Sequence, residues 1–129
     1  MIRHIKRYLA VRSYMHRLCQ ELVRRFGRQS HYSVENVTQA VQRGGLSAAF
    51  IAYAHAAYCT QEDFDAFYRP SIAGGSYLDL RRTVARRYFS GRLVFDAATI
   101  IRKFCPDRYS TSYGRGAEGN DGAASGGGV

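Results

Sequence analysis

The chain has 129 residues and carries 19 Lys and Arg side chains against 10 Asp and Glu, which gives a formal charge of +9. This length suits one domain with a single hydrophobic core. A hydrophobic content of 46% excludes a chain that is disordered throughout. No uncharged apolar run approaches the roughly 18 residues of a membrane-spanning helix, and three cysteines are too few for a disulfide scaffold.

The excess of basic residues limits the classes of partner. All but two of them, Lys6 and Lys103, are Arg, which suits bidentate contacts with phosphate or carboxylate. A G+C-rich coding background produces the same bias without selection for binding. An isoelectric point of 9.9 predicts attraction to nucleic acid, anionic lipid or an acidic protein, and it does not choose among them.

The first predicted element is a long amphipathic helix from Ile2 to Phe26, with Gly27 as a left-handed cap. Its apolar side chains cover about half of a helical wheel, and we expect that side to be buried in a bundle. The basic residues gather on the other side and are expected to face water in one row. They are Arg3, Lys6, Arg7, Arg17, Arg24, Arg25 and Arg28.

Five further helices are predicted from capping residues and apolar spacing. The segment from Ala48 to about Cys59 is apolar on several sides, which is typical of a central helix. A loop is expected at Ser71–Ser76. Three of the other predicted helices begin after a capping residue and end before a helix-breaking residue: one lies between Ser33 and Gly44, one between Thr60 and Pro70, and one between Asp96 and Pro106. The remaining predicted helix runs from about Tyr77 to Phe89.

These elements predict an all-α fold, a compact bundle of about six helices formed by residues 1–106. Apolar periodicity disappears after Asp107, and seven glycines lie between Gly114 and Gly128. Residues 107–129 are therefore predicted to form a flexible, disordered Gly/Ser-rich tail.

The first half of the chain resembles a family of short helical bacterial proteins of unknown function. The resemblance covers about residues 5–65 and implies a cytoplasmic bacterial protein, without an activity or functional residues. The residues that carry it are Tyr14, Leu18, Leu22, Phe26, Gly27, Tyr32, Ser33, Asn36 and Val37.

A second basic cluster comprises Arg81, Arg82, Arg86, Arg87 and Arg92. On a helical wheel its first four members scatter rather than share a face, and Asp79 can pair with Arg82 at a spacing of three residues. The cluster is interpreted as ordinary surface positions, unless it converges in space with the row on the first helix.

Two pairs of soft ligands, His16 with Cys19 and His55 with Cys59, could form a tetrahedral Cys₂His₂ site if they met. Their spacing matches no zinc motif, so all three cysteines are predicted to be reduced, buried and free of metal. Glu62, Asp63 and Asp65 are interpreted as carboxylates that favour a helix N-terminus. No cofactor and no catalytic residue is predicted.

The preferred hypothesis is a cytoplasmic, non-enzymatic module for protein interaction or structure, with an apolar groove between helices. The alternative is a protein that binds nucleic acid through the seven basic residues of the first helix. Docking on a membrane surface is disfavoured, because the apolar side of that helix is expected to be buried. The sequence determines neither the partner nor the oligomeric state.

Overall fold

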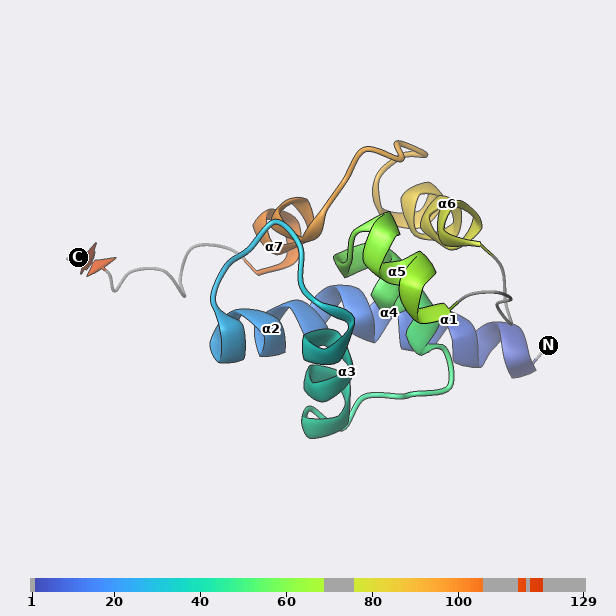
Figure 1. The fold of residues 1–129 in the computed structure, drawn as a ribbon, viewed down its shortest axis with the longest axis horizontal. Helices are drawn as coiled ribbons and strands as arrows, with labels where there is room; N and C mark the ends of the chain where they lie inside the picture. Colours follow the sequence, from blue (N-terminus) through green and yellow to red (C-terminus); the bar gives the residue numbers. More distant parts are fainter. Residues whose placement is uncertain (1, 69–75, 106–113, 116, 120–129) are drawn as a thin grey trace.

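The computed structural model describes residues 2–68, 76–105, 114–115 and 117–119, and confirms the predicted helical bundle (Figure 1). Residues 71–75 of the predicted loop and most of the predicted tail lie outside the described residues. Within the tail, β1 (Gly114–Arg115) and β2 (Ala117–Gly119) pair as short parallel strands. The helices are α1 (Ile2–His16), α2 (Leu18–Phe26), α3 (Val34–Arg43), α4 (Ile51–Tyr58), α5 (Gln61–Tyr68), α6 (Tyr77–Tyr88) and α7 (Ala97–Phe104).

Helices α1 and α2 together form the predicted first helix, interrupted only at Arg17. The backbone ladder continues through the interruption, because Arg17 N donates to Ser13 O at 2.8 Å and Glu21 N donates to Arg17 O at 3.2 Å. The two helices run nearly end to end along the molecule (Figure 1). Gly27 ends α2 with φ +78°, as predicted, but its ψ of 174° is extended rather than left-handed helical.

The predicted capping residues do cap their helices. The Ser33 hydroxyl accepts from Asn36 N at 3.0 Å, and the Thr60 hydroxyl accepts from Asp63 N at 3.1 Å. At the start of α7, Asp96 Oδ1 accepts from Thr99 N at 2.9 Å, with Thr99 bonded back to the Asp96 backbone. These caps depend on neighbours in the sequence, which is why the sequence predicts them.

The prediction that α4 begins at Ala48 is wrong, because the helix begins at Ile51. In a helix from residue 48, the Ser47 carbonyl would accept from Ile51 N. Instead it accepts from the Tyr14 hydroxyl of α1, and Ile51 N donates to Ala48 O at 3.3 Å. A tertiary hydrogen bond therefore shortens the helix at its N-terminus.

Helix α4 is the central element, as its apolar composition predicts. Every residue from Tyr53 to Cys59 is buried, and the helix packs against α1, α3, α5 and α6. The buried Tyr58 hydroxyl donates to Tyr14 O at 2.6 Å and so joins α4 to α1. Helix α2 packs against α3 and α7, so the long α1–α2 element contacts the central helix α4 through α1 and contacts α3 and α7 through α2.

Among the described residues, no helix combines the length and apolarity that a membrane crossing requires.

Candidate interaction surface

The apolar side chains in the N-terminal half of α1 are exposed, although the sequence predicts that they are buried in the bundle. Burial begins at Ala10 and Val11 and continues through Tyr14 and Met15. The preceding turns expose three aliphatic side chains that were expected to be buried, and we name them the outer stripe: Ile2, Ile5 and Leu9. The prediction of a fully buried apolar side is therefore wrong, because the face that packs in the bundle is rotated away from these three residues.

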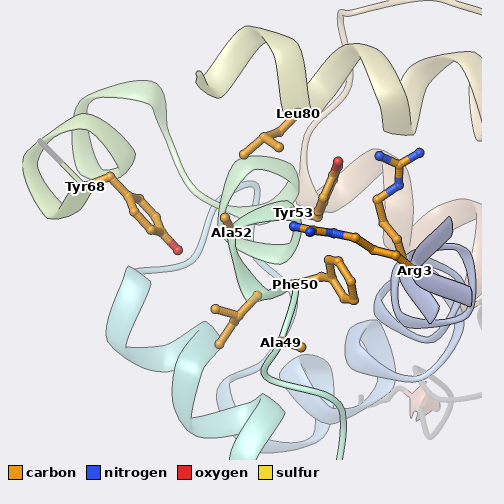
Figure 2. A pocket seen from close by; sticks show the side chains of 9 residues that line it. Arg3, Ala49, Phe50, Ala52, Tyr53, Tyr68 and Leu80 are labelled. Carbon is orange, nitrogen blue, oxygen red and sulfur yellow. The ribbon is translucent and has the colours of Figure 1, made fainter. Parts of the chain in front are cut away.

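On the opposite side of the same turns, two members of the predicted basic row face the bundle. Arg3 and Arg7 border a cavity of about 300 Å³ between the N-terminal half of α1 and helices α4, α5 and α6. Its remaining lining is apolar or aromatic and comprises Ala49, Phe50, Ile51, Ala52, Tyr53, Tyr68 and Leu80. We name this cavity the aromatic groove. Figure 2 shows Arg3 beside the rings of Phe50 and Tyr53, with Tyr68 on the other side of Ala52.

The two basic clusters of the sequence meet beside this groove. Arg7 of α1 and Arg86 and Arg87 of α6 surround a second hollow of about 300 Å³, together with Thr83. The Arg87 guanidinium also lies 4.2 Å from the centre of the Tyr8 ring, a cation–π contact between α6 and α1. We name Arg7, Arg86 and Arg87 the arginine cluster. The interpretation of Arg86 and Arg87 as ordinary surface positions missed this, since only the packing of α1 and α6 on the same helix, α4, brings them to Arg7.

The remaining members of the predicted row make contacts within the chain. Arg24 and Arg25 both pair with Glu21, at 2.6 Å and 3.1 Å. Arg17 donates to the Gly44 carbonyl, and Arg28 donates to the Cys105 carbonyl, both at 3.2 Å. Burial alone would raise the pKa of Glu21, but the hydrogen bonds from its two arginines outweigh burial and lower that pKa. The seven residues are therefore not one uniformly free row of cations.

The interpretation of Arg81 as an ordinary surface position is wrong, because this residue is buried inside the fold. Its side chain is 6% exposed, and its guanidinium donates to the carbonyl groups of Ala56, Leu93 and Phe95. Desolvation by burial lowers the pKa of Arg81. The predicted ion pair between Arg82 and Asp79 is confirmed, with the two side chains 3.3 Å apart.

The four residues of the alternative metal site do not converge. His55 is buried with both ring nitrogens engaged, one with Thr38 Oγ1 at 2.9 Å and the other with the Tyr68 hydroxyl. The ring of His16 packs edge to face against the ring of Phe104, with 4.7 Å between the two ring centres. In the part of the chain that the structure describes, no three His, Cys, Asp or Glu residues are grouped closely enough to hold a metal ion. Glu62 and Asp63 lie exposed in the first turn of α5, as interpreted, with Asp65 exposed one turn on.

A small all-helical domain whose arginines converge beside an aromatic groove is the class of structure that these observations define. Comparison with protein families matches the whole chain, residues 1–129, to a family of unknown function, DUF6559, and the chain belongs to this family. The match extends the resemblance seen in residues 5–65 to the full length. No curated protein and no solved structure matches the chain.

Proposed function

We propose that this protein is a small non-enzymatic interaction module that binds a protein partner in the aromatic groove. The observation that carries the proposal is the combination of an apolar floor with Arg3 and Arg7 at the border. The described residues around the groove include no Asp or Glu. Such a site suits a segment that inserts an aromatic or aliphatic side chain and carries flanking carboxylates.

The arginine cluster strengthens this choice of partner. Arg7 borders both hollows, so the positive surface continues from the groove onto α6. Positive charge around an apolar pocket accelerates the approach of an acidic segment and selects against a basic one. The groove therefore supplies apolar contact, and the cluster supplies charge complementarity.

Nucleic-acid binding is the second candidate, and the arginine cluster is the observation that favours it. Three guanidinium groups from two helices could contact neighbouring phosphates. The surface for this candidate is smaller than the predicted row, because Arg17, Arg24, Arg25 and Arg28 already bind groups of the chain. Duplex binding through the cluster would show a slope of log affinity against log salt of about −3.

A binding experiment separates the two candidates. The probes are fluorescent peptides in which Asp or Glu flanks a Phe or Leu, and a fluorescent DNA duplex of random sequence. The variant Arg3→Gln with Arg7→Gln removes two charges at the groove. The matched control, Arg24→Gln with Arg25→Gln, removes two charges on α2. A variant Phe50→Ser removes apolar contact without changing charge.

The proposal expects a peptide affinity that falls about tenfold in the Arg3/Arg7 and Phe50 variants and is retained in the control. Peptides that bind all variants equally would contradict it. Duplex binding with the steep salt slope and no effect of Phe50→Ser would favour the second candidate. No duplex binding tighter than about 100 μM at physiological salt would eliminate that candidate.

The cellular location is part of the same proposal. We place the protein in the cytoplasm of a bacterium, as the sequence resemblance implies. Cys19, Cys59 and Cys105 are buried free thiols, which suits a reducing compartment.

A further inference from the structure

The outer stripe is an exposed apolar surface that the aromatic groove does not use. Ile2, Ile5 and Leu9 are 69%, 57% and 52% exposed. Their spacing of three and four residues places them in one line along α1, on the side away from the buried Val11 and Tyr14. Three aliphatic side chains in one line on a helix form a contiguous exposed apolar patch, and such a patch is typical of a surface that binds a partner or a membrane.

The charges around the outer stripe are all of one sign. Lys6 follows Ile2 by four residues and Arg12 follows Leu9 by three, and both are exposed. These two residues border the stripe on opposite sides of the helical wheel. The first 20 residues of the chain contain five Lys and Arg and no Asp or Glu, so Glu21 is the first acid.

We propose that the outer stripe docks the N-terminal half of α1 on a membrane surface that carries anionic lipid. A helix in this orientation buries its aliphatic line at the boundary between headgroups and acyl chains. Lys6 and Arg12 have long stems, so their charged ends can reach lipid phosphates while the stems cover apolar surface. Each of the two contributions is small, so the attachment is reversible.

A second copy of the chain fits the same surface poorly. Pairing two outer stripes would bring Lys6 and Arg12 of both copies together, and the whole chain carries a charge of +9. A nucleic acid offers phosphates but does not bury a line of aliphatic side chains. The proposal does not rest on the proposed function, because none of the stripe residues lines the aromatic groove.

The absence of tryptophan from the sequence makes a direct test available. A single reporter is introduced as Leu9→Trp, with Val94→Trp as the matched control at an apolar position that is 95% exposed and lies just before α7. The probes are vesicles of phosphatidylcholine with phosphatidylglycerol, and vesicles of phosphatidylcholine alone. We expect a blue shift and protection from an aqueous quencher for Leu9→Trp with anionic vesicles only, and no change for Val94→Trp.

A second set of variants tests the contribution of the stripe without a reporter. Ile5→Gln with Leu9→Gln should lower the fraction bound to anionic vesicles at least about tenfold, while the thermal midpoint stays the same because both positions are exposed. Equal vesicle binding by this variant and the parent chain would overturn the proposal. So would no binding to anionic vesicles at low salt, or a blue shift of Leu9→Trp that grows with protein concentration in buffer alone, which would indicate a second copy.

Discussion

The guanidinium carbon of Arg81 lies 3.9 Å from the centre of the Phe95 ring, although the two residues are 14 positions apart and only Arg81 belongs to a helix. Arg81 is in α6, and Phe95 lies in the segment that leads into α7. The same guanidinium donates to the Ala56 carbonyl of α4 at 2.9 Å and to the Leu93 carbonyl at 3.0 Å. One buried charged side chain thus joins α4, α6 and the segment before α7.

Replacing Arg81 should therefore lower the free energy of unfolding of the protein. The variant Arg81→Met leaves three carbonyl groups without their donor, and we expect a loss of about 3 kcal/mol in the free energy of unfolding. The control Arg82→Met removes an exposed arginine and its pair with Asp79, and should change stability by less than about 1 kcal/mol. Urea unfolding of both variants measures the difference, and equal losses would contradict the structural role of Arg81.

Stability should fall with acid through the titration of His55. Burial lowers the pKa of His55 from 6.5 to about 4, so the unfolded chain takes up a proton at a higher pH than the folded one. The contribution of neutral His55 is complete above pH 6.5 and is lost as pH falls from 6.5 toward 4. The loss amounts to about 3 kcal/mol.

Urea unfolding at pH 7 and pH 4.5 checks this expectation in matched variants. His55→Gln should flatten the pH dependence, and His31→Gln, an exposed residue, should leave it as in the parent chain. The pKa of Glu21 is also lowered, and its contribution is lost only as pH falls below its ordinary value of 4.5. An unchanged slope in His55→Gln would show that other groups control the acid response.

The cysteines should be unreactive in the folded protein and should carry no metal. Burial raises the pKa of both Cys19 and Cys59 to about 12, which leaves almost no thiolate at neutral pH. Alkylation by iodoacetamide is therefore expected to be slow in buffer and fast in concentrated urea. Native mass spectrometry should find the mass of the chain alone, whereas one zinc ion per chain would revive the His16, Cys19, His55 and Cys59 site.

Removal of the C-terminal segment should leave the bundle intact. The apolar core described here ends with Ile100, Ile101 and Cys105, and β1 and β2 pair with each other. Deletion of Ser110–Val129 is expected to shift the thermal midpoint by less than about 3 °C, a change that corresponds to a small fraction of the stability of the domain. Circular dichroism during heating measures it, and a fall of many degrees would show that the segment packs on the helices.

Local features of the fold were predictable from the sequence, because the groups that cause them are close in the chain. Ser33, Thr60 and Asp96 each bond to a backbone N–H three residues later, and Val34, Val37, Ala40 and Val41 share one helical face that is buried. The start of α4 was not predictable in this way. It depends on a hydrogen bond between Tyr14 and Ser47, which are 33 residues apart.

The candidate site could be predicted only in part. Helical periodicity identifies the apolar and basic sides of α1, but it does not say which arc meets the bundle or at which turn burial begins. Ala10 is buried while Leu9 is exposed, a distinction that the packing of α1 against α4 and α7 creates. The meeting of Arg7 with Arg86 and Arg87 has the same origin, since these residues are about 80 positions apart in the sequence.

The packing of α7 against α2 has a consequence for synthesis of the chain on the ribosome. Two hydrogen bonds join α7 to the connection that follows α2: Ala97 N donates to Ser30 O at 2.9 Å, and Arg28 donates to the Cys105 carbonyl. Part of the packing surface of α2 is therefore supplied by the last helix of the bundle. The residues of α2 that α7 covers must remain accessible during translation until residue 105 has left the exit tunnel. Chaperones that bind exposed apolar segments can therefore engage α2 in the nascent chain, and folding of the bundle is completed only after α7 has emerged.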